Sequence, residues 1–163
     1  MRRPMLFLDV DGVLNPFGGP CPEGFAEHTL FPGEEPVRVN PEHGTWITEL
    51  RGTFDVIWAT FWNEDANRLL VPLLGIGPLP VLTMPSVPSR PEVKVPLIAS
   101  CAGGRPAVWI DDAHASEARA WSEGRLAPTR LITTDPAVGL TRAHVVQALE
   151  WARSLTTGQC RSQ

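Results

Sequence analysis

The sequence predicts an α/β fold in which a mostly parallel five-stranded sheet is covered by helices on both faces. Short apolar runs alternate along the chain with segments whose apolar residues recur at helical spacing, as in parallel sheets connected by helices. Acidic or hydroxyl residues directly follow several of these apolar runs. The chain has 163 residues, 43% of them hydrophobic, which is enough for one domain with a buried core.

Five segments are expected to form the strands. The first contains Met5-Leu6-Phe7-Leu8, and such a continuously apolar run is typical of a parallel strand that is buried on both faces. In chain order, the expected strands are 5–8, 54–59, 80–83, 107–110 and 129–133. The segment 80–83 is the weakest of the five.

Residues 15–40 form an excursion between the first strand and the first helix. Nine of them are proline or glycine, a density that breaks any long helix or central strand. Within the excursion, 25–31 and 37–39 are expected to form a short hairpin, which would act as a small flap.

Helices are expected between the strands. Asn40-Pro41-Glu42 is typical of a helix start, with a capping residue followed by proline in the first turn. The other expected helices are 63–74, 92–102, 115–122 and 140–155. We expect a single domain over residues 1–156, followed by a polar, frayed tail over 157–163.

Composition narrows the class of protein. The formal net charge is −4 and the sequence pI about 5.5, which argues against broad electrostatic attraction to nucleic acid or to anionic membranes. No segment has the length of a membrane span, and the N-terminus lacks the features of a signal peptide. Three cysteines without zinc or redox spacing are expected to be free thiols. We therefore expect a soluble cytoplasmic protein.

Two acids follow the first apolar strand in the sequence Asp9-Val10-Asp11-Gly12-Val13. Carboxylates that are close together and partly buried are costly unless a cation or a network of donors compensates them. Mg²⁺ prefers such hard oxygen ligands. A capping or turn role is the alternative for a single aspartate, but Asp-x-Asp-Gly directly after a buried strand favours a metal or catalytic site.

A second acidic pair, Asp111 and Asp112, follows the strand expected over 107–110. Taken alone, either acid is equally well explained as the cap of the next helix. Two acid clusters at one edge of a sheet would repel each other unless a cation lies between them. The two pairs together therefore favour a metal site.

Two further residues are suited to holding a phosphate. Thr60 ends the second strand, where a hydroxyl and nearby backbone N–H groups can hold an anion, although a plain helix cap is an equal alternative. Lys94 is the single lysine among 14 basic residues, so its ammonium is an exception in an arginine-rich chain. It can bind phosphate or neutralise a carboxylate, and the alternative is a solvated surface lysine.

These four segments, in this order, resemble the motifs of the haloacid dehalogenase-like (HAD) superfamily. The resemblance covers about residues 4–155 and rests on Asp9-Val10-Asp11-Gly12-Val13, Thr60, Lys94 and Asp111-Asp112. It implies a three-layer Rossmann-like fold. The excursions at 15–40 and 75–90, where this superfamily inserts its cap domains, are too short for a large cap, so only the hairpin flap is expected.

The resemblance also implies a function, namely a phosphatase that works through an aspartyl-phosphate. Asp9 would be the nucleophile and Asp11 the general acid and base. Mg²⁺ would be held by Asp9, the backbone carbonyl of Asp11 and Asp111, with Asp112 as a ligand or a neighbour of the ligands. Thr60 and Lys94 would bind the phosphate.

The residues that flank these positions are expected to line the substrate site: Gly12, Ala59, Phe61, Trp62 and Asn63. Trp62 is suited to stacking on a base, with helix packing as the alternative. Without a cap the site would be open, which suits a large phosphorylated substrate such as a nucleotide or polynucleotide end. The chain is also similar to small bacterial HAD domains associated with RNA-repair proteins.

Two alternatives stay open beside the phosphatase. One is a phosphate-binding or interaction protein on the same scaffold, without turnover, and the other is a phosphotransferase. The sequence indicates neither an oligomeric state nor whether the partner is a small molecule or a nucleic-acid end.

Overall fold

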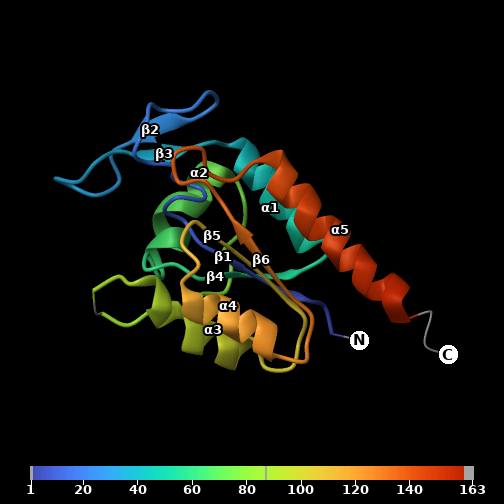
Figure 1. The fold of residues 1–163 in the computed structure, drawn as a ribbon. Helices are drawn as coiled ribbons and strands as arrows, with labels where there is room; N and C mark the ends of the chain where they lie inside the picture. Colours follow the sequence, from blue (N-terminus) through green and yellow to red (C-terminus); the bar gives the residue numbers. More distant parts are fainter. Residues whose placement is uncertain (1, 87, 160–163) are drawn as a thin grey trace.

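The computed structural model describes residues 2–86 and 88–159, and this part of the chain contains a parallel sheet of four strands. The strands are β1 (Met5–Leu8), β4 (Asp55–Trp58), β5 (Ala107–Asp111) and β6 (Thr129–Thr133). Their spatial order is β4-β1-β5-β6, and every neighbouring pair is parallel. All four carboxyl ends therefore meet at one edge of the sheet, and the predicted α/β class is confirmed (Figure 1).

The prediction of a fifth strand over 80–83 is wrong, because the described sheet has four strands rather than five. This segment makes only one parallel bridge, to Trp58 at the outer edge of β4. Pro80 has no N–H with which to extend the ladder in one direction. In the other direction the N–H of Met84 donates to the side chain of Asn63, at 2.7 Å, instead of to a strand.

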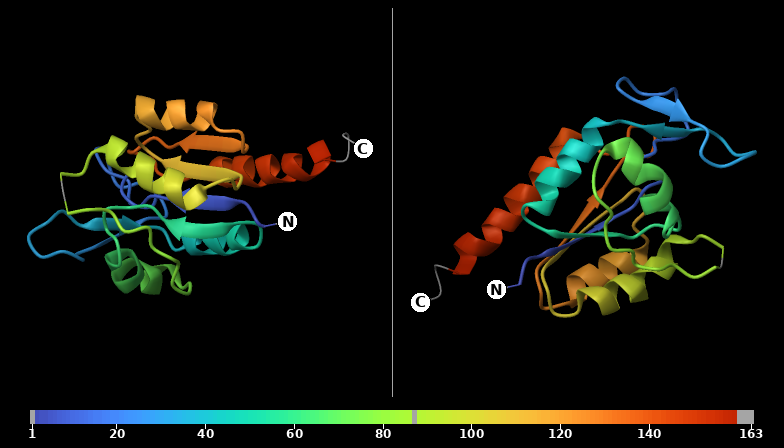
Figure 2. Two further views of the ribbon diagram at one scale, coloured as in Figure 1. Left: turned by 90° about the horizontal axis from the view of Figure 1, so that it is seen from below. Right: turned by 180° about the vertical axis from the view of Figure 1, so that it is seen from behind.

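Successive strand residues face two separate cores. In β1, Leu6 and Leu8 belong to the first core, whereas Met5 and Phe7 belong to the second. Helices α1 (Glu42–Arg51) and α5 (Arg142–Gln159) cover the first core, and α3 (Lys94–Ala102) and α4 (Ser116–Gly124) cover the second. Figure 2 shows the two helix layers on opposite faces of the sheet, as the three-layer expectation requires.

The helix expected over 63–74 forms in a different geometry. Its first part is a π-helix, η1 (Ala66–Leu70), which passes into the short α-helix α2 (Val71–Leu74). The N–H of Val71 donates to the carbonyl of Ala66, five residues back. Pro72 explains the wider turn, because it has no N–H to donate to a carbonyl four residues back. Before α3, a short 3₁₀ turn, η2 (Pro91–Val93), replaces the start of the helix expected at residue 92.

The expected hairpin is present and lies at the carboxyl edge of the sheet (Figure 1). Strand β2 (Ala26–His28) pairs antiparallel with β3 (Val37–Val39). Val37 and Val39 are buried in the first core, so the hairpin is anchored to the body of the domain. The described residues include no large cap, in agreement with the shortness of the excursion.

The C-terminal helix is longer than expected. α5 continues to Gln159, so 157–159 belong to the helix and not to a frayed tail, and 160–163 lie outside the described residues, as does Cys160. The hydroxyls of Thr156 and Thr157 donate to carbonyls three residues back and follow the helical course. Within the described part of the chain, no helix has both the length and the apolarity needed to cross a membrane.

His43 is a buried polar group that fixes the hairpin side of the first core. Its Nε2–H donates to the carbonyl of Leu140 at 3.1 Å, and its ring packs edge-on against Phe25, with centroids 5.4 Å apart. Its Nδ1 has no hydrogen-bond partner among the described residues. Burial lowers the pKa of the imidazole to about 4, although the Leu140 carbonyl works in the opposite direction.

This pKa predicts an acid sensitivity of the fold. As pH falls from 6.5 to 4, the unfolded chain gains a proton at His43 while the folded chain stays neutral, so the folded state loses stability. The loss from this residue is about 3 kcal/mol. His43→Gln keeps a donor near Leu140 and removes the titration. Urea unfolding at pH 6.5 and pH 4 is expected to show a smaller loss in the variant, and equal losses would contradict the assignment.

Candidate active site at the carboxyl edge of the sheet

The sheet order brings the predicted site residues together. Asp9 directly follows β1, Thr60 lies two residues beyond β4, and Asp111 is the last residue of β5. Because β1 lies between β4 and β5, these three residues project from neighbouring strand ends. The clustering that the sequence predicts at this edge is present.

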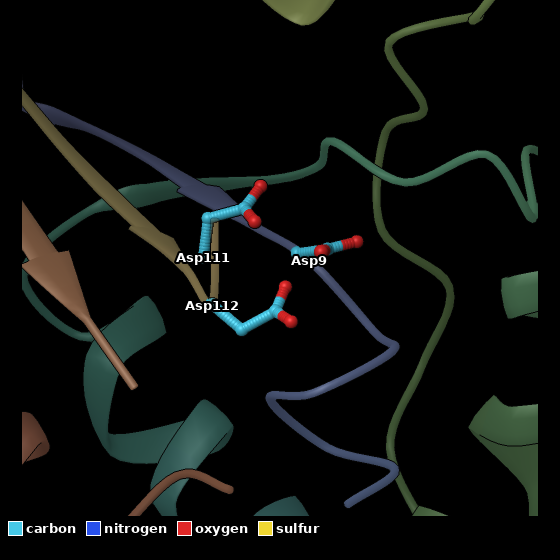
Figure 3. A group of neighbouring side chains, drawn as sticks. All are labelled: Asp9, Asp111 and Asp112. Carbon is cyan, nitrogen blue, oxygen red and sulfur yellow. The ribbon is translucent and has the colours of Figure 1, made fainter. Parts of the chain in front are cut away.

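Three carboxylates form a cluster at the centre of the site. Asp9, Asp111 and Asp112 each offer an oxygen within 4.8 Å of the other two. Asp9 and Asp111 are buried, and Asp112 is half-buried. Figure 3 shows their carboxylates turned toward the same region, Asp9 from the end of β1 and the other two from the end of β5.

Lys94 joins this cluster from the first residue of α3. Its Nζ lies 3.1 Å from Oδ1 of Asp9 and 2.7 Å from Oδ2 of Asp111. With only 4% of its surface exposed, it is not a solvated surface lysine. Burial lowers the pKa of the ammonium, but the two carboxylates outweigh this effect and raise the pKa above its ordinary value. Lys94 is therefore charged.

One ammonium would not balance three ionised carboxylates, which together would leave two negative charges. Burial raises the pKa of Asp9 well above its ordinary value, more than Lys94 lowers it. At Asp111 burial acts in the same direction, but Lys94 outweighs it and holds the pKa low. Burial, followed by the charge of Asp111, raises the pKa of Asp112 to about 6. A doubly charged cation with a preference for oxygen ligands, such as Mg²⁺, fits this cluster.

Asp11 stands apart from the three clustered acids. Asn15 donates to its Oδ1 at 2.9 Å, and the indole N–H of Trp62 donates to its Oδ2 at 3.1 Å. Both oxygens are thus held by side-chain donors, away from the carboxylate cluster. The carboxylate cluster is accordingly formed by the side chains of Asp9, Asp111 and Asp112, whereas the side chain of Asp11 is directed to other partners.

Thr60 and Phe61 form another wall of the pocket that surrounds these acids. The buried Thr60 hydroxyl accepts a hydrogen bond from the N–H of Trp62 at 3.1 Å, so it caps this turn. Its own hydrogen has no acceptor among the described residues and remains free to donate to a bound oxygen. The ring of Phe61 lies 5.7 Å from Nζ of Lys94. Ala59 is buried in the second core beneath this wall.

Asn63 connects two segments of the chain through its side chain. Its side chain accepts from the N–H of Met84 and donates to the carbonyl of the same residue, at 2.7 and 3.2 Å. It also has a positive φ of 50°, which asparagine tolerates better than most residues. These bonds tie the loop after β4 to the segment around Met84, and Asn63 does not line the pocket that surrounds the acids.

The candidate catalytic pocket, which surrounds these acids, has a volume of about 290 Å³. Asp9, Thr60, Lys94 and the second acidic pair line it, and so do residues that the sequence did not single out. One of these is Arg90, which is exposed and forms an ion pair of 3.7 Å with Glu92. In a chain rich in arginine, no sequence signal distinguishes this residue from the others.

Other missed residues orient the acids. The indole of Trp109 donates to Oδ2 of Asp111 at 3.2 Å. A signal for this contact was available, because residues two apart on a strand share a face. The hydroxyl of Thr134 donates to the carbonyl of Gly12 at 2.7 Å and so fixes the turn after β1.

Gly12 makes room for Asp112. Its φ is +76°, and a Cβ at this position would lie 2.4 Å from the carboxyl group of Asp112. Gly18 has a similar φ of +81°, but a Cβ added there would meet no atom within 4 Å. The two glycines therefore differ in the close approach and not in the backbone conformation.

Alanine substitutions at these glycines are expected to separate strain from site geometry. Gly12→Ala and Gly18→Ala should each lose about 1–2 kcal/mol of stability from the left-handed backbone. Only Gly12→Ala displaces Asp112, and it should weaken Mg²⁺ binding by about 10–100-fold. Titration calorimetry with MgCl₂ measures this difference. Equal Mg²⁺ affinity in the two variants would contradict a role of Asp112 at the metal.

The parallel sheet and the order of the four segments at its edge define a domain of the HAD class. A family model described as "HAD domain in Swiss Army Knife RNA repair proteins" matches residues 5–145, and the chain belongs to this family. The resemblance seen in the sequence is thereby confirmed, together with a scaffold of the HAD phosphohydrolase type. No curated protein matches the chain at a significant level.

Proposed function

We propose that the protein is a Mg²⁺-dependent phosphatase that hydrolyses a phosphate monoester through an aspartyl-phosphate on Asp9. The observation that carries the proposal is the separation of the two acids after β1. Asp9 lies in the buried cluster with Lys94, whereas Asp11 is held 2.9 Å from Asn15 and 3.1 Å from Trp62. Asp9 thus lies beside the cation that balances its charge, as a nucleophile requires. Asp11 lies apart from it, beside the pocket, as a proton donor requires.

The reaction follows from these positions. An oxygen of Asp9 attacks the phosphorus, and Oδ2 is the one left for this task, because Oδ1 already accepts from Val10 and Lys94. As the new P–O bond forms, the bond to the leaving oxygen breaks and Asp11 gives that oxygen a proton. Water then attacks the phosphorus, Asp11 takes its proton, and the Asp9 carboxylate is regenerated with inorganic phosphate.

The remaining groups hold the transferred phosphoryl group. Lys94 and the free hydroxyl hydrogen of Thr60 donate to its oxygens, and Arg90 adds a cation at the pocket edge. Mg²⁺, held by Asp9, Asp111, the backbone carbonyl of Asp11 and in part Asp112, would neutralise charge on the phosphate. The proposal of a metal is supported by the cluster of three carboxyl groups, whose negative charges a single ammonium cannot balance.

A nucleotide or a polynucleotide end is the substrate class that we propose. The family description refers to RNA-repair proteins. Among the described residues, moreover, there is no large cap over the catalytic pocket to restrict what enters.

The proposal is tested with para-nitrophenyl phosphate, an aryl ester that needs no specific leaving-group contacts. Phosphate release is expected with MgCl₂ and should disappear with EDTA. Absence of turnover, together with binding of beryllofluoride and Mg²⁺, would favour a non-catalytic phosphate-binding protein. Phosphoryl transfer to added glycerol in excess over hydrolysis would favour a phosphotransferase.

A further inference from the structure

A second cavity, of about 840 Å³, lies between the hairpin and Trp62. It shares Asp11 and Phe17 with the catalytic pocket, so the two spaces adjoin at the proposed proton donor. In the proposed reaction Asp11 protonates the leaving oxygen. The group that departs with this oxygen must therefore lie next to Asp11, and this cavity is the space available there.

Aromatic rings form one part of the cavity lining. Phe17 is 49% exposed, which is unusual for so large an apolar side chain. Phe31 packs edge-on against Trp62, with ring centroids 4.9 Å apart at 81°. The ring of Trp62 cannot turn freely, because its indole N–H donates to the carboxylate of Asp11. Fixed aromatic surface of this kind suits a flat ring.

Carboxylates form the other part of the cavity lining. Glu27, Glu34 and Glu35 are exposed and line the cavity. Arg38 is the one cation among the lining residues, and its guanidinium is already occupied. It donates to the carbonyls of Pro16 and Gly19 and lies 3.6 Å from Glu27. The cavity therefore presents hydrogen-bond acceptors and negative charge, without a cation free to receive a second phosphate.

We propose that this cavity binds the leaving group, and that this group is an aromatic ring with N–H donors and no further phosphate, as in a nucleoside monophosphate. The inference rests on the proposed phosphatase function and narrows its substrate class. An internal phosphodiester next to the terminal nucleoside would meet the three glutamates and be repelled. The enzyme is thus expected to prefer mononucleotides to the ends of longer chains.

The test compares substrates that share one terminal phosphate. Nucleoside 3′- and 5′-monophosphates of adenosine and cytidine are each compared with a trinucleotide that ends in the same nucleotide. The kcat/KM of the mononucleotide is expected to be about tenfold higher or more. Raising the salt concentration should increase the trinucleotide value, because salt screens repulsion, whereas attraction of nucleic acid would be weakened.

Two variants connect this preference to the cavity. Glu34→Gln combined with Glu35→Gln should raise kcat/KM for the trinucleotide several-fold. Each single variant, Glu34→Gln or Glu35→Gln, is compared with Glu23→Gln, which removes one carboxylate outside the cavity lining on the same excursion and is the matched charge control. Phe31→Ala should lower the ratio of mononucleotide to acetyl phosphate kcat/KM by about tenfold. Acetyl phosphate has a leaving group too small to fill the cavity.

Each outcome separates this inference from the function on which it rests. A trinucleotide hydrolysed as fast as or faster than the mononucleotide, with a rate that falls as salt rises, would overturn the inference and leave the phosphatase intact. Equal effects of the single cavity variants and Glu23→Gln would overturn it too. Failure to hydrolyse para-nitrophenyl phosphate in MgCl₂ would instead contradict the phosphatase itself.

Discussion

Replacing Asp9 by asparagine is expected to lower phosphate release by at least about 10³-fold, because an amide oxygen cannot form the aspartyl-phosphate. Asparagine has nearly the same shape and can still accept the hydrogen bond from Val10 N–H, at 2.8 Å in the native chain. Burial raises the pKa of Asp9, which means that the charged form is disfavoured in the fold. Stability without metal should therefore be unchanged or higher in Asp9→Asn.

The combination of lost activity and retained stability is the decisive result. Initial rates with para-nitrophenyl phosphate measure the first quantity, and urea unfolding in EDTA measures the second. Asp135→Asn is the matched control, since Asp135 also lies beyond a strand end, but within the described part of the chain its side chain accepts only from the N–H of Ala137 in its own turn. Full activity in Asp9→Asn would exclude Asp9 as the nucleophile, whatever the behaviour of the control.

Lys94→Met is expected to have the largest effect on stability. Methionine fills much of the space of the lysine stem but leaves Asp9 and Asp111 buried without their cation, which typically costs about 3–5 kcal/mol. The loss should shrink as the pH falls toward 4, because protonation removes the uncompensated charges. Added Mg²⁺ should restore part of the stability for the same electrostatic reason.

Arg90→Met provides the comparison for this variant. Arg90 is a cation of the same pocket, but its side chain is 68% exposed, so its loss should change stability by less than about 1 kcal/mol. Urea unfolding in EDTA and in MgCl₂, at pH 7 and pH 4.5, measures both variants. Equal stabilities for Lys94→Met and the native protein at pH 7 would show that Lys94 does not balance the acids.

Much of the site could be predicted from the sequence, because its main members are marked locally. Asp9 follows a continuous apolar strand, and Lys94 stands out as the sole lysine. Parallel strands bring such terminal residues to one edge whatever the details of the loops. The hairpin was also predictable, since glycine and proline exclude other structures around its two short strands.

The contacts that orient these residues could not be predicted in the same way. Trp62 and Asp11 are 51 positions apart in the sequence, so their hydrogen bond depends on the tertiary fold. Asn15 lies in a segment whose sequence predicts only an irregular loop, and nothing in it indicates the contact with Asp11. The strand expected over 80–83 is reduced to one bridge, because Pro80 has no N–H to donate and the next donor beyond the segment, the N–H of Met84, bonds to the side chain of Asn63, a tertiary contact. Asn63 itself was expected at the substrate and is instead used to hold this loop.

The two cores of the sheet support different halves of the candidate site. Lys94 extends from α3, which packs in the second core, and Phe61 rests on the same core. Phe31 and Trp62, which line the cavity proposed for the leaving group, pack against the first core. Changes in the hairpin and the first core can therefore reshape substrate choice while the groups that hold the phosphoryl oxygens keep their support. A domain divided in this way can diversify in specificity over evolution without rebuilding its chemistry.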